Sequence, residues 1–373
     1  MPFLLDAMKR GLKTLWAREL NYVCIPHQTL VTEIAMRILK PALVGLLLLV
    51  SSAPVTAGMT LDAVKQKGFV QCGVSTGLAG FSQPNSQGVW SGIDIDMCKA
   101  IAAAIFNDAE AYKVTPLTVV ERFTALQTGE IDVLTRNTTQ TLTRDTTLGL
   151  VGAGVNFYDG QGVMVKKDLG VKAAKELEGV KVCVSPGTTS ELNLADWSRE
   201  NDIDVKPVVI EKLDEIVSAL VDGRCDAYTT DKSVLASVRT TLDKPNAYEI
   251  LPDTFSKEPL GPVVRQDDNE WFNVVRWTLF AMIEAEEYGI TSKNAQEMLE
   301  SSNPNVQRIL GVTPGMGANL GLDNEWAFNI VSQVGNYGET FERHVGADSP
   351  LKLARGLNAT WRQGGLMYGW PIR

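Results

Sequence analysis

The fold class is decided by the stretch Val180-Lys181-Val182-Cys183-Val184-Ser185-Pro186-Gly187-Thr188-Thr189. Its opening run of largely apolar residues predicts a buried strand, and the Ser-Pro-Gly turn leads directly into a predicted helix at 190–197. Further along, the chain predicts a strand at 208–210, a helix at 213–220 and a strand at 225–230. Strands that alternate with helices indicate an α/β fold with a largely parallel sheet.

The first half of the chain follows the same strand–loop–helix order without repeating the sequence. The pattern predicts, in order, a strand at 69–74, a turn-rich segment at 75–92, a helix at 97–106, a short helix at 123–127 and a strand at 131–135. Met97, Ile101 and Ile105 are spaced so that they form one apolar face of the longer helix. Both halves therefore predict an α/β layer of their own.

Two glycine-containing segments bracket the second half and indicate crossings between lobes, namely Gly160-Gln161-Gly162 and Glu258-Pro259-Leu260-Gly261. After the second crossing, residues 271–287 form the clearest predicted helix, with its cap at 268–269. We expect this helix to pack back onto the first lobe. We also expect the tail from Asn303 onward to be ordered and to wrap around the protein.

Length, composition and charge narrow the classes of function. The 373 residues, of which 45% are hydrophobic and 21% charged, are typical of a globular protein of two ordinary domains and exclude disordered and collagen-like chains. The formal net charge of −9 argues against a nucleic-acid partner, because binding to a duplex needs clustered Lys and Arg side chains. His27 and His344 are the only histidines, which argues against a His-based metal site or a Ser-His-Asp triad.

The beginning of the chain has the features of an export signal. The basic run Met36-Arg37-Ile38-Leu39-Lys40 precedes an apolar run at 41–50, and Val55-Thr56-Ala57 supplies the small residues that signal peptidase requires. We therefore expect residues 1–57 to be a cleaved signal peptide region, with Met36 as the true start. The apolar run is about half of the roughly 20 residues that cross a bilayer, so a retained membrane helix is the weaker interpretation.

The cysteines beyond this segment suggest disulfide bonds. An even number of cysteines in an exported chain favours pairing. Four are present, which leaves three possible connectivities among Cys72, Cys98, Cys183 and Cys225.

Three polar segments follow predicted strands and could carry chemistry. The first, at 136–145, places hydroxyl groups beside arginines, and a guanidinium can hold a planar carboxylate with two hydrogen bonds. The alternative interpretation of this segment is a polar surface loop. The second, at 185–191, has the capping-box spacing Thr188-x-x-Glu191, and the helix N-terminus that it caps could also bind an anion. It lacks the Gly-Lys-Ser/Thr ending of a phosphate-binding P-loop.

The third segment is at 227–232 and centres on Asp231, which ends an apolar strand. Its carboxylate could accept hydrogen bonds from an ammonium group, although aspartates at strand ends also cap turns. An anion-binding arginine in one lobe and a cation-binding aspartate in the other would together form a clamp for a zwitterion.

The order of these motifs resembles the polar amino-acid family of bacterial periplasmic solute-binding proteins over residues 59–300. The resemblance rests on Gly92-Ile93-Asp94-Ile95-Asp96, Ala125-Leu126-Gln127-Thr128-Gly129-Glu130-Ile131-Asp132, Asn137-Thr138-Thr139 with Arg144, Gly187-Thr188-Thr189, and Gly223-Arg224-Cys225-Asp226-Ala227 with Asp231. More narrowly, the general L-amino-acid-binding subfamily that serves ABC importers is similar at Arg136-Asn137-Thr138-Thr139, Phe157-Tyr158-Asp159-Gly160-Gln161-Gly162 and Gly364-Gly365-Leu366-Met367-Tyr368.

The resemblance implies an α/β, two-lobed type II periplasmic binding protein with two hinge strands and a ligand cleft between the lobes. Lobe 1 would comprise residues 58–160 and 261–373, and lobe 2 residues 161–260. The implied function is the non-catalytic, periplasmic substrate-binding component of an ABC importer for L-amino acids, with broad specificity. Its partners would be the amino acids and the membrane permease subunits, and it would act as a monomer without nucleic acid, metal or cofactor.

The resemblance also implies roles for individual residues. Arg144 would bind the ligand's α-carboxylate and Asp231 its α-ammonium. Thr139, Thr188 and Thr189 would help to bind the carboxylate, and Asn137 would also contact the ligand. The first lobe would line the side-chain pocket with Ser75, Phe81 and Trp90. The small residues Ser185 and Pro186, before the Gly-Thr-Thr loop, favour broad specificity.

Within that fold we predict the disulfides Cys72–Cys98 and Cys183–Cys225, one in each lobe. The first pair would join a strand to the helix packed on it, and the second would join two neighbouring strands.

One alternative function belongs to a different class. Some members of the family are periplasmic cyclohexadienyl dehydratases, and such a lyase needs a general acid placed over the leaving group. Glu121, beside the helix at 123–127, is the one candidate that the sequence offers.

Overall fold

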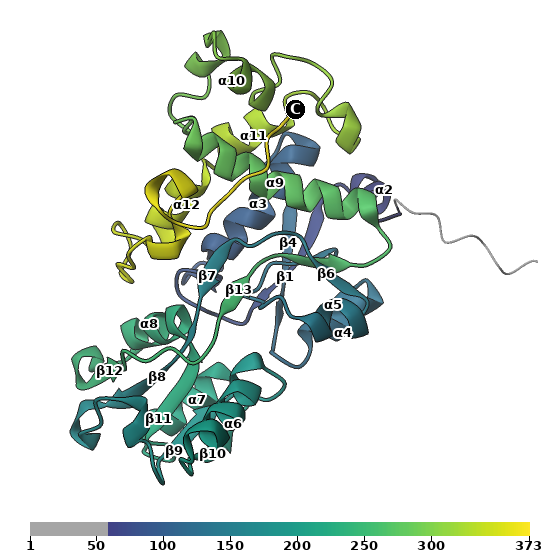
Figure 1. The fold of residues 1–373 in the computed structure, drawn as a ribbon. Coiled ribbons are helices and arrows are strands. Elements are labelled where there is room, and N and C mark those ends of the chain that lie inside the picture. The colour runs from purple at the N-terminus through teal and green to yellow at the C-terminus, as the bar shows by residue number, and fades with distance from the viewer. Residues whose placement is uncertain (1–58) are drawn as a thin grey trace, which may run out of the picture. The chain divides into compact units, whose positions relative to one another are not determined.

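The computed structural model describes residues 59–373 and contains two five-stranded sheets. The first sheet has the strand order β4-β1-β5-β14-β6, formed by β4 (Tyr112–Leu117), β1 (Val70–Ser75), β5 (Val133–Leu134), β14 (Val263–Arg265) and β6 (Leu150–Gly152). Its strands β4, β1 and β5 are parallel, and β14 runs antiparallel to β5 and β6. We call this sheet with its helices the first lobe (Figure 1).

The second sheet repeats this arrangement. Its order is β10-β9-β11-β8-β12, formed by β10 (Lys206–Val209), β9 (Lys181–Val184), β11 (Ala227–Asp231), β8 (Gln161–Lys166) and β12 (Tyr248–Ile250). Strands β10, β9 and β11 are parallel, and β8 is antiparallel to both β11 and β12. We call this sheet with its helices the second lobe. The expected α/β class is confirmed, but each sheet is mixed rather than largely parallel, with two parallel and two antiparallel strand pairings.

Two short strands connect the lobes. β7 (Phe157–Asp159) pairs antiparallel with β13 (Glu258–Leu260), so that Glu258 lies opposite Asp159. These strands lie at the two crossings that the glycine-containing segments predict, although Gln161 and Gly162 already belong to β8. The chain therefore passes between the lobes twice, and the two passages are hydrogen-bonded to each other.

Helices cover both sheets. The first lobe carries α2 (Met59–Lys67), α3 (Ile93–Phe106), α4 (Arg122–Thr128), α5 (Leu142–Thr147) and α9 (Asn269–Glu287), and the second carries α6 (Thr189–Asn201), α7 (Leu213–Val221) and α8 (Lys232–Thr241). Five of these helices correspond to helices that the sequence predicts, namely α3, α4, α6, α7 and α9. α9 is capped by the Asp268 side chain, which accepts a hydrogen bond from the Trp271 N–H at 3.0 Å.

α3 begins four residues earlier than the apolar stripe predicts, at Ile93. Gly92 makes this start possible, because its φ of 133° suits glycine and a Cβ there would lie 2.0 Å from the Phe81 carbonyl oxygen. The strand predicted at 131–135 is shorter than expected and pairs only at Val133 and Leu134. Several further elements were not predicted, namely the helices α2, α5 and α8 and the strands β4, β6, β8, β12 and β14.

The tail after Asn303 is ordered, as expected. It forms α10 (Pro304–Ile309), α11 (Trp326–Gln333) and α12 (Tyr337–His344), which pack on α9 and α3 in the first lobe (Figure 1). The carboxylate of Asp96 on α3 lies 2.8 Å from His344 Nε2 and also pairs with Arg343. The predicted signal peptide region, including Met36 and the cut after Ala57, lies outside the described residues.

Both predicted disulfides are confirmed. Cys72 on β1 is bonded to Cys98 on α3 with their Cα atoms 6.3 Å apart, and Cys183 on β9 is bonded to Cys225 with a Cα separation of 5.7 Å. Cys225 lies just before β11 rather than within it. Each bond joins a strand of the sheet to a neighbouring element. A disulfide that closes a loop of this length stabilises a protein by about 3–4 kcal/mol, because it lowers the conformational entropy of the unfolded chain.

The Asp96 pair predicts an acid-sensitive contact between the tail and α3. Burial alone raises the pKa of Asp96, but the hydrogen bond and charge of His344 and the charge of Arg343 outweigh it, so the pKa lies below the ordinary 3.8. A carboxyl whose pKa is lowered by folding stabilises the protein above its unfolded pKa and loses that effect as the pH falls through the folded value. Asp96→Asn should therefore be less stable than the unmodified protein at pH 6, and the difference should shrink below about pH 4.

Urea unfolding at both pH values measures this difference. Asp108→Asn, which changes an exposed aspartate in the same lobe, is the matched control. A stability difference that stays constant between the two pH values would contradict the assignment.

Candidate functional site

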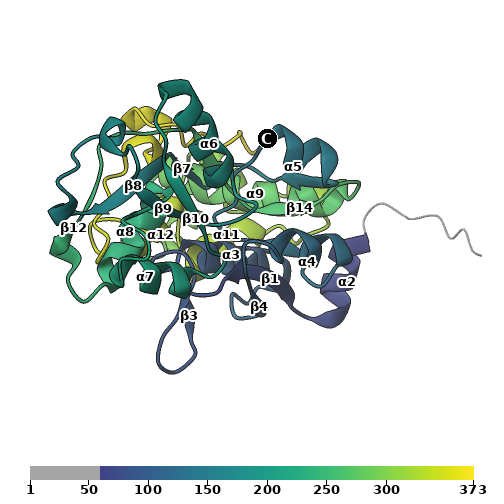
Figure 2. The same cartoon turned by 90° about the horizontal axis from the view of Figure 1, so that it is seen from below.

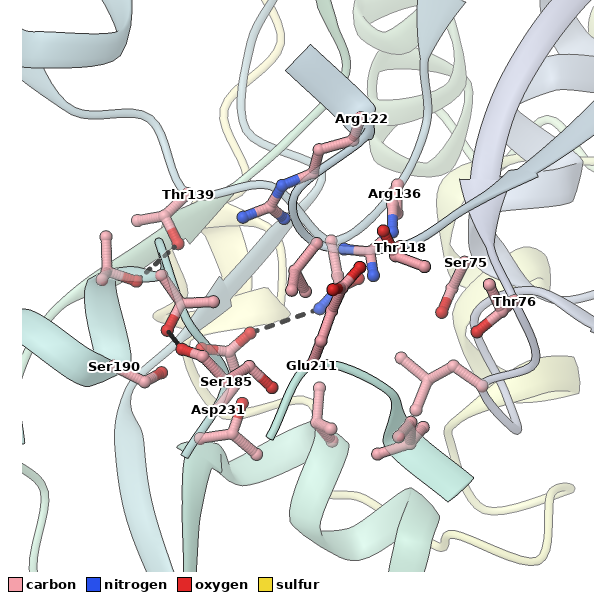
Figure 3. A pocket seen from close by; sticks show the side chains of 18 of the residues that line it. Ser75, Thr76, Thr118, Arg122, Arg136, Thr139, Ser185, Ser190, Glu211 and Asp231 are labelled. Atoms are coloured by element: carbon pink, nitrogen blue, oxygen red, sulfur yellow. Dashed lines mark hydrogen bonds between the residues drawn. The ribbon is translucent and has the colours of Figure 1, made fainter. Parts of the chain in front are cut away.

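A cavity lies where the parallel strands of both sheets end. Residues that follow β1, β4 and β5 line one side, and residues that follow β9 and β11 line the other, as expected for ligand sites at the carboxyl ends of strands in α/β sheets. The polar lining residues include Ser75, Arg122, Arg136, Asn137, Thr139 and Arg144 from the first lobe, and Ser185, Thr188, Thr189, Ser190, Tyr228 and Asp231 from the second (Figure 3).

Arg144 stands on α5 and is largely buried. Its Nη1 donates to the carbonyl oxygen of Thr139 at 2.6 Å, and its guanidinium lies 4.9 Å from the ring centre of Phe123. Burial lowers its pKa, and the charges of Glu258 and Asp231 oppose that shift. No carboxylate of residues 59–373 pairs with it, so the remaining N–H groups of the guanidinium are available to an anion.

The Gly-Thr-Thr loop begins α6 beside this arginine. Thr188 caps the helix, since its hydroxyl accepts from the Glu191 N–H at 3.2 Å. The reciprocal bond of the expected capping box is not formed, because the Glu191 side chain instead accepts from the N–H of Gly187 at 2.8 Å. The backbone N–H groups of Thr189 and Ser190 belong to the first turn, which has no intrahelical acceptor for them.

Asp231 occupies the end of β11 and is 5% exposed. Its one hydrogen bond from another side chain comes from Asn137 Nδ2 in the first lobe, at 3.4 Å. Burial raises its pKa well above the ordinary 3.8, and the neighbouring carboxyls of Asp159 and Glu258 raise it further. Since no Lys or Arg of the described residues pairs with it, a ligand cation would supply the missing charge.

Asn137 is held in a special backbone conformation. Its φ is 22°, and its N–H donates to Oδ2 of Asp94 at 3.3 Å. Burial raises the pKa of Asp94 to about 7, against the opposing effects of that hydrogen bond and of the Arg136 charge. Backbone strain of this kind collects at functional sites, where surrounding contacts enforce it.

Glu258 links the connecting strand to both lobes. It is 1% exposed, and its two oxygens accept hydrogen bonds from four side chains, namely Thr139 at 2.6 Å, Thr189 at 3.0 Å, Asn193 at 3.0 Å and Ser256 at 2.5 Å. The hydroxyls that we predicted as ligand contacts at Thr139 and Thr189 are therefore engaged by Glu258 and lie 3.4 Å from each other.

The structure does not bring all predicted site residues together. Ser75 lines the cavity, whereas Phe81 and Trp90 do not. Phe81 is 1% exposed in the core, with its ring edge-to-face against Phe157 at 5.4 Å. Trp90 belongs to β3 (Trp90–Ser91), which pairs with β2 (Gln83–Pro84) in a hairpin that projects from the first lobe (Figure 2).

The lining residues that were not predicted include Arg122, Tyr228 and Glu211, and Arg136 was named without a role. Glu121, the general acid of the alternative function, does not line the cavity. It is exposed, and its carboxylate accepts from the Thr118 N–H at 2.9 Å, which lowers its pKa. A carboxyl with a lowered pKa is a poor proton donor at neutral pH.

Within residues 59–373, no group of three His, Cys, Asp or Glu side chains is placed to hold a metal ion. That same range contains no helix with the length and apolar character needed to cross a membrane.

Comparison with known proteins yields consistent matches. The family model for bacterial extracellular solute-binding proteins, family 3, matches residues 70–294. The general L-amino acid-binding periplasmic protein AapJ of Rhizobium johnstonii is 54% identical over 90% of this chain and 99% of its own length. The glutamate/glutamine/aspartate/asparagine-binding protein BztA of Rhodobacter capsulatus is 51% identical over 88% of this chain and 97% of its own.

A solved structure shows the same fold. It is an ABC transporter periplasmic binding protein from Brucella ovis with glutathione bound, which is 55% identical and has a TM-score of 0.84. The match covers 85% of this chain and all of that one.

The Glu258 network predicts a large effect from a single side chain. Glu258→Ala removes the acceptor of four buried or partly buried donors, and each donor that finds no other partner costs about 1–3 kcal/mol. We expect a loss of at least about 2 kcal/mol in the free energy of unfolding, measured from the urea midpoint. Glu258→Gln keeps the shape and one oxygen and should lose clearly less. Equal stability of Glu258→Ala and the unmodified protein would contradict the network.

Proposed function

The chain belongs to the bacterial extracellular solute-binding proteins of family 3, and from this membership we propose that it is the periplasmic substrate-binding component of an ABC importer for L-amino acids. One observation carries the proposal. The two lobes present opposite, unpaired charges to one cavity, a guanidinium at Arg144 and a carboxyl at Asp231.

The charges match the backbone of an amino acid. A carboxylate that leaves water must regain its hydration as charge-assisted hydrogen bonds, and the Arg144 guanidinium with the N–H groups of Thr189 and Ser190 supplies them. Asp231 supplies the acceptor for the ammonium group. Because the pKa of Asp231 is raised by burial and by neighbouring carboxyls, a cation beside it returns the carboxyl to its charged form.

The proposal includes broad specificity within L-amino acids. Ser185 and Pro186 are small and leave room beside the second lobe, and the relative AapJ is named as a general L-amino acid-binding protein. The role is binding rather than catalysis. The ligand would be handed to membrane permease subunits, and the N-terminal 57 residues would direct export to the periplasm.

The class of ligand can be tested at the two charged side chains. Removing one partner of a buried charged contact costs about 2–5 kcal/mol, which is a factor of roughly 30 to several thousand in affinity. Arg144→Ala and Asp231→Ala should each lose affinity on this scale for every amino acid tested, as measured by calorimetry after a thermal-shift screen of the twenty amino acids.

Arg224→Ala and Asp222→Ala are the matched controls, because both side chains are exposed on the second lobe outside the cavity. They should bind like the unmodified protein. If Arg144→Ala weakened only acidic or amide ligands and spared aliphatic ones, Arg144 would contact the ligand side chain and the clamp would be wrong.

A further inference from the structure

The C-terminal tail contacts one of the two strands that connect the lobes. Asn358, in the single turn η6 (Gly356–Asn358), is 5% exposed and uses both ends of its side-chain amide on Tyr158 of β7. Its Oδ1 accepts from the Tyr158 N–H at 2.7 Å, and its Nδ2 donates to the Tyr158 carbonyl oxygen at 3.0 Å. The amide therefore pairs with Tyr158 as a residue of a neighbouring strand would.

These two groups of Tyr158 have no partner in the other connecting strand. Tyr158 lies opposite Pro259 of β13, which has no N–H to donate, and the Pro259 carbonyl oxygen accepts from the Gln140 N–H at 2.9 Å. A backbone N–H or carbonyl that leaves water without finding a partner costs free energy. Asn358 supplies both partners, so the position of β7 depends on the tail.

A second part of the tail holds the beginning of the same strand. The Tyr337 hydroxyl, on α12, donates to the carbonyl oxygen of Asn156 at 3.0 Å, one residue before β7 begins. One turn further along α12, the ring of Phe341 stacks on that of Phe157, with the ring centres 6.0 Å apart. Tyr337, Phe341 and Phe157 are all buried. We call Tyr337, Phe341 and Asn358 the β7 brace.

The β7 brace is fixed to the first lobe through α9. Arg355 donates from Nε and Nη2 to the carbonyl oxygen of Asn358, at 3.1 and 2.9 Å. The same guanidinium pairs with Glu286 of α9 at 2.9 Å and lies 4.0 Å from Glu342 of α12. All three residues of the brace lie beyond residue 294, where the match to the family model ends.

The β7 brace restricts where the first crossing can bend. Tyr158 is held by the first lobe, whereas the carbonyl oxygen of Gly160 accepts from the Lys232 N–H of the second lobe at 2.9 Å. Asp159 is the one residue between these contacts. Its side chain accepts from the Ser233 N–H of the second lobe at 3.1 Å. A change in the angle between the lobes is therefore taken up by the backbone next to Asp159.

The second crossing is restricted in the same way. The Phe255 N–H donates to the carbonyl oxygen of Gln161 in the second lobe at 2.9 Å, whereas Pro259 is bound by Gln140 of the first lobe. Residues 256–258 lie between these contacts. Hinge movements are generally absorbed by a few residues of this kind.

We propose that Asn358 and Tyr337 are positioning residues, which hold β7 on the first lobe so that the lobes open and close by bending at Asp159 and at residues 256–258. The proposal rests on the proposed function, because a ligand enclosed by both lobes enters and leaves by such a movement. A hinge that is ordered before the ligand binds loses less conformational freedom on closure, which favours binding. The brace therefore raises the affinity for every ligand by one common factor, whatever its side chain.

Amide hydrogen exchange and calorimetry on variants of the full chain test this role. In Asn358→Ala the Tyr158 N–H loses its acceptor, so NMR should show its exchange accelerated about tenfold or more. The affinities for alanine, leucine and glutamate should fall about threefold to tenfold, by one common factor. Tyr337→Phe keeps the ring and removes only the hydrogen bond to Asn156, so it should lower the three affinities uniformly and by less.

Two further variants separate positioning from a general loss of stability. Asn329→Ala is the matched control, because Asn329 is also 5% exposed, lies on α11 of the same tail and forms no hydrogen bond to β7 or β13. It should leave the Tyr158 exchange and the affinities unchanged even where it lowers the melting temperature. Asn358→Asp retains an acceptor for the Tyr158 N–H and should keep that amide protected. If Asn358→Ala does not fold, Tyr337→Phe supplies the comparison of affinities.

The two proposals fail in different ways. Unchanged exchange of the Tyr158 amide in Asn358→Ala would overturn the brace, and so would affinities that stay the same or fall by factors that differ among the three ligands. If the unmodified protein binds no amino acid, the proposed function is wrong, and the exchange of Tyr158 still decides whether Asn358 holds β7.

Discussion

Buried charge without a partner is the constraint on which the cleft depends. Asp231 in the second lobe and three arginines in the first lobe lie close to one cavity, and none forms an ion pair within residues 59–373. Removing such charged groups from water costs free energy, and the folded protein is destabilised by that amount unless a ligand or water interacts with them. The arrangement therefore favours a state in which a ligand of complementary charges stands between the lobes.

The rest of the molecule holds these groups in place. In the first lobe, α3 is fixed to β1 by a disulfide and to the C-terminal helices by the pairing of Asp96 with Arg343 and His344. In the second lobe, β9 is fixed to the segment before β11 by the other disulfide. The disulfides and the Asp96 contacts stabilise both lobes. The polar side chains at the strand ends can therefore remain without protein partners and still be held in a stable fold.

Much of the fold could be predicted from the sequence, because it depends on local pattern. The strand at 180–184, the Gly-Thr-Thr turn and the helix after it follow from periodicity and turn chemistry. The short strand at 133–134 was overestimated, because its length is set by pairing with β1 and β14 rather than by its own residues. Phe81 was assigned to the side-chain pocket from the family resemblance, but its side chain is buried in the core and packs against Phe157, a placement that depends on tertiary packing.

Arg122 is the site residue that was hardest to predict from the sequence. An arginine at the first position of a short helix ordinarily points to solvent, and neither periodicity nor a motif marks it as buried. Its burial arises because α4 begins after the short loop that follows β4, so that its first side chain lies in the cavity at the carboxyl ends of the strands. Tyr228 was missed for the related reason that a buried residue near the end of a strand can face either the core or the cleft. The site residues that were not predicted lie where strand ends from the two lobes face each other. Local sequence patterns do not show which residues meet there, because that depends on how the two lobes are arranged.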